Sequence, residues 1–240
     1  MNQLLTKDLL NTLLAEIKAA DTPANRVNYQ QFFKEKLEHP VGLRTSVLRG
    51  ISARHFKRVK ALEKEAVLDI CEGLLASRKR YMRFFAFEWA GKVALRYETT
   101  DFTRFEKWLD AYVDDWADCD SLCCGVIGPL VVRFPELSAK TAKWARSRNL
   151  WRRRAAAVSL IVPARQGLLI DRVLRAAEVL LEDSEDLVQK GYGWMLKEAG
   201  SSFFPEVEQF VMTHKAEMPR TALRYAIEKW PPAKRKQAMK

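Results

Sequence analysis

Apolar residues recur at helical spacing along most of the chain. In FTRFEKWLDAYV (102–113) they return every three to four positions, and polar residues fill the gaps, as is typical of an amphipathic helix. No alternation typical of a β-strand extends beyond chance. The same spacing predicts a leading helix within 1–24, a more apolar run over 121–134, and helices over 25–37, 64–77, 79–95, 136–147, 150–162, 168–183, 184–200, 204–215 and 219–230. The sequence therefore predicts an all-α protein.

The predicted helices form pairs, in which a moderately amphipathic helix alternates with a more apolar one. Arg154, Gln189 and Arg220 begin comparable apolar runs that are 35 and 31 residues apart, and Trp108 and Trp144 lie 36 residues apart. A period of this length with two helices per unit is typical of an α-solenoid. We predict one domain over residues 1–240, with a flexible basic tail at 231–240.

Composition narrows the class of protein. Hydrophobic residues make up 48% of the chain, so a large core is possible. No apolar run approaches the roughly 18 residues of a membrane span, and the N-terminus lacks the layout of a secretory signal. We expect a soluble cytoplasmic protein, from a bacterial cytosol or nucleoid, with no membrane partner. The 41 Lys and Arg residues outnumber the 30 Asp and Glu residues, which favours a polyanionic partner, nucleic acid first.

The charge is distributed unevenly along the chain. Residues 143–175 contain nine basic side chains and one acid, whereas residues 101–120 contain seven acids and two bases. Three consecutive arginines, Arg152, Arg153 and Arg154, cannot share one helix face. At least one must point inward and needs a carboxylate or a phosphate as partner. We interpret the segment as a contact for nucleic-acid phosphates; the alternative is that these cations coat solvated helix faces.

Motifs for catalysis by other chemistries are missing from the sequence. There is no GxSxG, GxxxxGK[ST], GxGxxG or HExxH pattern. The four cysteines form no CxxC pair and lie far in sequence from the three histidines, so no metal site is predicted. We interpret Cys119 and Cys123, four residues apart on one helix face, as small core residues.

Three short segments carry a resemblance to a known family. They are WADCDS (116–121), NLWRRRAA (149–156) and QKGYGWMLKE (189–198). In their residues, order and spacing they resemble the AlkD family of DNA alkylation repair glycosylases, which are HEAT-like-repeat proteins. The resemblance implies a HEAT-like α-solenoid with a concave basic surface. It also implies a monofunctional glycosylase of base excision repair that excises cationic N3- or N7-alkylated purines from double-stranded DNA. No cofactor is implied, and we expect a monomer.

The resemblance also implies a set of site residues. The family's active-site aspartate, two tryptophans and arginine fall on Asp120, Trp116, Trp194 and Arg154. Asp120 would stabilise positive charge on the sugar and orient water, the tryptophans would cradle the deoxyribose, and Arg154 would hold a phosphate. Further phosphate contacts are expected from Arg148, Arg152, Arg153, Lys190 and Lys197.

Each assignment has an alternative. Asp118 or Asp120 could cap a helix, and we assign that role to Asp118. Arg154 could be the ion-pair partner of an inner acid such as Asp120. The whole protein could bind distorted or branched DNA without catalysis, or it could be a protein-interaction scaffold. The sequence leaves open the lesion spectrum, and whether the segment 35–60, which lacks the family's compact pattern, alters DNA binding.

Overall fold

A computed structural model describes residues 2–24, 31 and 42–240 of the chain. Those residues form helices and loops without a strand, so the all-α prediction is confirmed. The helix expected over 25–37 falls outside the described residues. Two compact units divide the chain, one over 1–93 and one over 94–240, and each is described by itself. The single domain over 1–240 and the concave basic surface stay predictions.

The first unit is built on four helices of the described chain: α1 (Asn2–Ala20), α3 (Thr45–Phe56), α4 (Lys64–Ala76) and α5 (Arg80–Lys92). Helix α1 packs against α3 and α4, and α4 packs against α5. Leu9, Leu13 and Ile17 repeat every four residues on α1 and are buried, which is why this helix docks along one stripe. Trp89 is also buried, and its indole nitrogen donates to Ser52 Oγ at 2.9 Å.

The second unit contains the remaining helices. They are η1 (Ala94–Arg96), α6 (Asp101–Tyr112), α7 (Trp116–Leu122), the π-helix η2 (Cys123–Ile127), α8 (Gly128–Arg133), η3 (Pro135–Leu137), α9 (Ser138–Trp144), α10 (Leu150–Val158), α11 (Ile161–Arg165), α12 (Ile170–Val179), α13 (Asp186–Ala199), α14 (Phe204–His214), α15 (Arg220–Ala226) and α16 (Pro232–Ala238).

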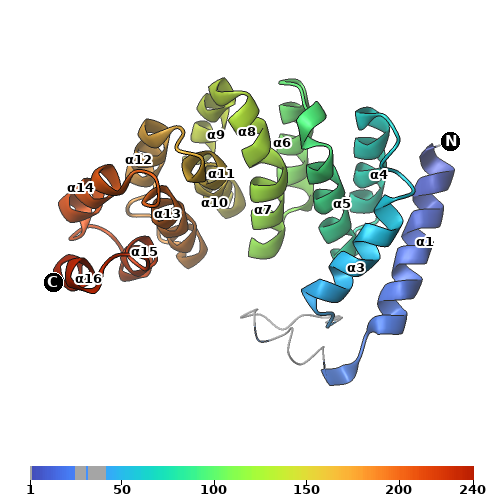
Figure 1. Ribbon diagram of the computed structural model, residues 1–240, viewed down its shortest axis with the longest axis horizontal. Coiled ribbons are helices and arrows are strands. Elements are labelled where there is room, and N and C mark those ends of the chain that lie inside the picture. The colour runs from blue at the N-terminus through green and yellow to red at the C-terminus, as the bar shows by residue number, and fades with distance from the viewer. Residues whose placement is uncertain (1, 25–30, 32–41) are drawn as a thin grey trace. The chain divides into compact units, whose positions relative to one another are not determined.

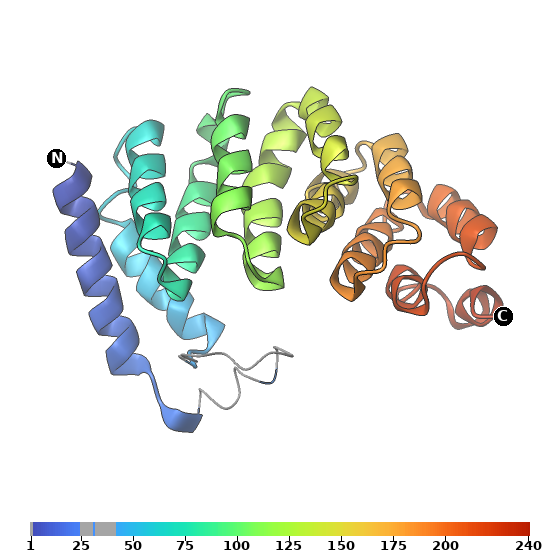
Figure 2. The same ribbon diagram turned by 180° about the vertical axis from the view of Figure 1, so that it is seen from behind.

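Within this second unit the helices stack in two rows. Helices α7, α10, α13 and α15 follow one another as neighbours, and Figures 1 and 2 show them side by side. Helices α9 and α12 pack against each other and against α10, and α12 and α14 pack against α13. Small residues Ala155, Ala156 and Ala157 of α10 are fully buried, so neighbouring helices approach closely. The paired stacking confirms the predicted solenoid arrangement of helix pairs.

Three local expectations differ from the structure. The predicted helix over 150–162 breaks after Val158 and resumes as α11 at Ile161. The tail at 231–240, expected to be flexible, instead forms α16, because Ala238 is buried and Lys234 binds the Glu208 carboxylate at 2.5 Å. The helix cap assigned to Asp118 is provided by Asp115, whose side chain accepts from the Asp118 backbone nitrogen at 2.8 Å.

Hydropathy gives one further finding. Within the described residues, no single helix has both the length and the hydropathy to cross a membrane. One pair of segments, Trp116–Arg133 and Pro135–Trp144, meets both criteria only when the two are taken together, and they are bent by 120°.

Candidate active site

An ion pair between α7 and α10 lies at the centre of the candidate site. Arg154 donates from Nε to Asp120 Oδ1 at 2.9 Å and from Nη2 to Oδ2 at 2.8 Å. Its remaining nitrogen, Nη1, donates to the Leu187 carbonyl oxygen just inside α13. The Arg154 side chain is 6% exposed and the Asp120 side chain 19% exposed. One guanidinium therefore links three stacked helices.

This geometry gives Arg154 the partner that was the alternative to a phosphate. All three guanidinium nitrogens have protein acceptors, and the inner acid among them is Asp120. Arg154 therefore positions Asp120, and its contact with a phosphate stays a prediction. A fork-to-fork pair of this kind fixes both the distance and the plane of the carboxylate.

Burial and pairing act in opposite directions on the two charges. Burial raises the pKa of Asp120, whereas its hydrogen bonds to Arg154 and the charge of that residue lower it, and the net pKa is above the ordinary value. For Arg154, burial lowers the pKa, but the hydrogen bonds and charge of Asp120 outweigh it and the pKa is raised. Asp120 is thus a more basic carboxylate than an exposed one, and the charge of Arg154 favours its ionised form.

Trp116 and Trp194, the two tryptophans assigned to the site, are both partly exposed. Trp116 precedes Asp120 by one turn on α7 and shares its face. Trp194 follows Gly191 by three residues on α13, and a Cβ at Gly191 would lie only 3.3 Å from Arg154 Cγ. The fold brings Asp120 and Arg154 together, and the assembly of the two tryptophans with this pair stays a prediction. Of the tryptophans that we interpreted as structural, Trp89, Trp108, Trp144 and Trp230 are buried and Trp151 is half-buried.

Two glycines of α13, Gly191 and Gly193, allow neighbouring groups to pack closely against this helix. Gly191 leaves room for the Arg154 side chain. At Gly193 an added Cβ would lie 2.6 Å from the Ala222 carbonyl oxygen and 2.7 Å from Tyr225 Cβ. Gly193 therefore allows α15 to lie directly against α13.

A second polar cluster beside Trp194 was missed in the sequence. Glu198 is buried, and its carboxylate accepts from Arg165 Nε at 2.8 Å and from Lys229 Nζ at 3.1 Å and 3.2 Å. It also accepts from the Trp194 indole nitrogen at 3.3 Å. The Arg165 guanidinium lies over the Trp194 ring, 6.0 Å from its centroid. Burial raises the pKa of Glu198, but the hydrogen bonds of Arg165 and Lys229 outweigh it and the pKa is lowered.

The two clusters are neighbours. Both lie along α13, since Arg154 contacts the Leu187 carbonyl oxygen and packs at Gly191, and Glu198 follows Gly191 by seven residues, or two turns. The spacing of charged residues along the sequence could have identified Glu198, because Arg165 precedes it by 33 residues and Lys229 follows it by 31. These separations match the repeat period, as does the 34-residue separation of Asp120 and Arg154.

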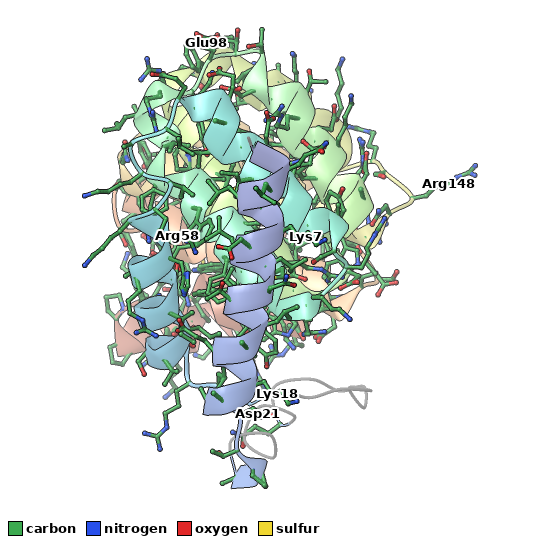
Figure 3. The ribbon with its side chains drawn as sticks, turned by 90° about the vertical axis from the view of Figure 1, so that its right-hand side faces the viewer. Lys7, Lys18, Asp21, Arg58, Glu98 and Arg148 are labelled. Atoms are coloured by element: carbon green, nitrogen blue, oxygen red, sulfur yellow. The ribbon has the colours of Figure 1, made fainter. Side chains whose placement is uncertain are left out.

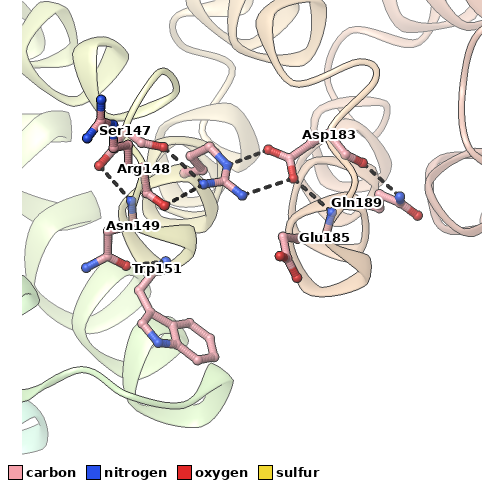
Figure 4. Close-up of polar contacts among 8 residues, drawn as sticks. Ser147, Arg148, Asn149, Trp151, Asp183, Glu185 and Gln189 are labelled. Atoms are coloured by element: carbon pink, nitrogen blue, oxygen red, sulfur yellow. Dashed lines mark hydrogen bonds and ion pairs between the residues drawn. The ribbon is translucent and has the colours of Figure 1, made fainter.

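The other two arginines of the RRR run are also paired with acids. Arg152 donates to both carboxylate oxygens of Asp110 and to Glu106. Arg153 donates to the Asp183 carboxylate at 2.6 Å and to the backbone oxygens of Ser147 and Arg148. Figure 4 shows the contacts that converge on Asp183. Neighbouring carboxylates therefore neutralise both guanidinium groups in this structure, and the expected phosphate contacts at Arg152 and Arg153 stay predictions.

The remaining expected phosphate contacts differ in their surroundings. Lys190 binds Asp186 at 2.7 Å, and Lys197 binds Glu228 at 3.0 Å and lies over the Tyr225 ring. Arg148 is exposed and its side chain extends outward from the loop before α10 (Figure 3). Arg153 fixes the backbone of that loop. A role in DNA binding stays a prediction for these three residues.

Three of the four cysteines, Cys71, Cys119 and Cys123, are buried in the core, and Cys124 is half-buried. All four are free. Burial raises the pKa of Cys123 well above its ordinary value and that of Cys124 to about 12, so neither supplies a thiolate at neutral pH. Carboxylate oxygens of Asp114, Asp115 and Asp118 lie within 4.8 Å of one another. Within the described residues, these three carboxylates have a spacing that could hold a metal ion. The capping hydrogen bond from the Asp118 backbone nitrogen to the Asp115 side chain accounts for part of this arrangement.

Comparisons with known proteins give a family and a fold. A family model described as DNA alkylation repair enzyme matches residues 13–230. The chain is similar to a solved structure described as a predicted DNA alkylation repair enzyme from Enterococcus faecalis, with 16% sequence identity and a TM-score of 0.76. That alignment covers 88% of this chain and 97% of the other, and at this identity it shows the fold alone. No curated protein matches the chain.

Proposed function

Because the chain belongs to the DNA alkylation repair enzyme family, and so has a role in the repair of alkylation damage, we propose that it is a monofunctional DNA glycosylase. Its proposed substrates are cationic N3- and N7-alkylated purines in double-stranded DNA. The observation that supports this proposal best is the largely buried ion pair in which Arg154 fixes the Asp120 carboxylate. We further propose that the enzyme works as a monomer in a bacterial cytoplasm, without a metal or an organic cofactor.

The chemistry requires little more than charge stabilisation. An alkylated purine that already carries a positive charge leaves as a neutral base when the bond from C1′ to its ring nitrogen breaks and the base takes the electron pair. Positive charge then develops on the sugar, where the negative carboxylate of Asp120 stabilises it. Water adds to C1′, and its proton passes to Asp120 or to solvent. The raised pKa makes the Asp120 carboxylate a better proton acceptor than an exposed one.

Trp116 and Trp194 supply the apolar surroundings of this step. Both indole rings are half-buried, so each offers an exposed aromatic surface that attracts a cationic sugar or base. Glu198 holds the nitrogen edge of Trp194 at 3.3 Å, which fixes the orientation of that ring. In this role Arg154 is a positioning residue, since it contacts Asp120 and protein backbone.

A second candidate is a protein that binds distorted or branched DNA without excision. One observation favours it: both oxygens of Asp120 accept hydrogen bonds from Arg154, which is the arrangement of a salt bridge whose role is to hold two helices together. A carboxylate keeps free lone pairs after two such bonds, so the pairing is compatible with either function. The two proposals differ in whether a base is released.

The direct test is base release from a duplex that carries a single N7-methylguanine or N3-methyladenine. The proposal predicts a free alkylated base, an intact strand with an abasic site, and no borohydride-trapped covalent adduct. An undamaged duplex of the same sequence is the control. Tight duplex binding without release from either lesion would favour the non-catalytic candidate, and strand cleavage with a trapped adduct would refute the monofunctional mechanism.

A further inference from the structure

Most cations expected to face DNA are already neutralised. Arg152 faces two acids, and Arg153, Arg154, Lys190 and Lys197 each bind a carboxylate. A cation that is saturated by its own carboxylate contributes little to phosphate binding. The positive charge available beside the candidate active site must therefore come from other side chains.

Glu198 organises an excess of positive charge at the edge of Trp194. Its single carboxylate binds two cations, Arg165 and Lys229, so the cluster carries a net charge of about +1. The carboxylate is 9% exposed, whereas the Arg165 and Lys229 side chains are 47% and 52% exposed. The negative charge thus lies inside and both positive groups face solvent.

The donors of these cations remain available to a ligand. Arg165 uses Nε for Glu198, which leaves the N–H groups of its two terminal nitrogens for an oxyanion. Lys229 has three ammonium hydrogens and one carboxylate partner. Since both cations lie within 3.2 Å of one carboxylate, a single phosphate can bridge them.

We propose that Arg165 and Lys229, held by Glu198, form a binding subsite for a DNA backbone phosphate beside Trp194. This rests on the proposed function and places the backbone next to the reacting nucleotide, since Glu198 lies two turns along α13 from Gly191, which packs against Arg154. Glu198 is a positioning residue: it fixes the two cations and the Trp194 ring on one carboxylate. A phosphate bound here presents the adjoining deoxyribose to Trp194 and Asp120.

Binding to undamaged duplex DNA tests the subsite without any need for base release. Fluorescence anisotropy over a range of salt concentrations would compare wild type with Arg165→Gln and Lys229→Gln. Each substitution is expected to weaken binding by about tenfold and to make the slope of log K against log salt shallower by about 0.9. Because each substitution removes one of the two cationic partners of the buried Glu198, the unfolding temperature of each variant is measured to confirm that it is folded at the assay temperature.

Arg175→Gln is the matched control. Arg175 belongs to the basic segment 143–175, but the structure places it exposed on α12, in the other row of helices from Arg165 and Lys229, where it lines a surface pocket with Asp171 and His214. The same loss of charge there is expected to leave the affinity and the salt slope unchanged. If Arg165→Gln and Lys229→Gln behave like Arg175→Gln, the subsite is refuted, whether or not the enzyme releases bases. Weakened binding without base release would retain the subsite and refute only the glycosylase.

Glu198→Gln separates positioning from charge. The substitution removes a negative charge, so simple charge counting predicts tighter binding. Positioning predicts binding weakened by about tenfold, because two long side chains must then be ordered by the ligand. Tighter binding by Glu198→Gln would refute the positioning role of this residue.

Discussion

Substituting Arg154 with Met removes the cation that fixes Asp120 while keeping much of the side-chain volume. The substitution leaves the Asp120 carboxylate without its partner and the Leu187 carbonyl oxygen without the Arg154 donor. Breaking a buried ion pair from one side costs about 3–5 kcal/mol. We expect a loss of about 3 kcal/mol, at the low end of this range, because Asp120 is 19% exposed and retains some contact with water.

Thermal unfolding followed by circular dichroism measures this loss. For a chain of this size, about 3 kcal/mol lowers the Tm by roughly 6–12 °C. The double variant Arg154→Met with Asp120→Asn is expected to recover part of the loss, because it no longer buries an unpaired charge. Arg175→Met on the exposed face of α12 is the surface control. A cost for Arg154→Met no larger than that of this control would refute the buried-pair account.

The same variant changes the pH dependence of base release. Burial raises the pKa of Asp120, and Arg154 opposes that rise. Without Arg154 the pKa rises further, so the ionised carboxylate is lost at a higher pH during acidification. The acid limb of the single-turnover rate is therefore expected to move to higher pH in Arg154→Met. An unchanged acid limb would mean that Asp120 does not control the rate.

Three other substitutions test the packing, the cap and the second cluster. Gly193→Ala would place a Cβ 2.6 Å from the Ala222 carbonyl oxygen and is expected to lower the free energy of unfolding in urea by about 1–3 kcal/mol. Gly50→Ala, whose Cβ would have no atom nearer than 3.8 Å, is expected to leave that free energy unchanged. Equal effects of the two substitutions would contradict the close packing at Gly193. Asp115→Ala removes the α7 cap and is expected to cost about 1 kcal/mol; an unchanged Tm would show that Asp115 does not stabilise the helix. Because the pKa of Glu198 is lowered in the folded protein, its ionised carboxylate stabilises the fold at pH values above the ordinary pKa of 4.5. This stabilisation is lost as the pH falls through the lower pKa of the folded state. The Tm of Glu198→Gln should therefore fall less than that of wild type on acidification, and parallel curves would refute this linkage.

The helical pattern could be predicted closely where amphipathicity is strong. The segment 102–113 forms α6 over Asp101–Tyr112, and 204–215 forms α14 over Phe204–His214, because a stripe of apolar side chains determines both the helix and the face it buries. The tail at 231–240 was mispredicted because its stability depends on a tertiary contact, Lys234 with Glu208, rather than on its own composition.

The site was less predictable because its charges pair across repeats. Composition alone suggested that Arg152 and Arg153 face a polyanion, but Asp110 lies 42 residues before Arg152 and Asp183 lies 30 residues after Arg153. Such partners become visible in sequence only when acids and bases are compared one repeat apart. The same comparison would have connected Glu198 with Arg165 and Lys229.

The most direct test of the central claim is the single-turnover rate of base release by wild type and Asp120→Asn on a duplex with one N7-methylguanine. Asp171→Asn, an exposed acid on α12, is the charge-matched control. The account predicts that Asp120→Asn keeps its duplex affinity and loses at least about 100-fold in rate, while Asp171→Asn matches wild type. An Asp120→Asn rate close to that of wild type would contradict the account.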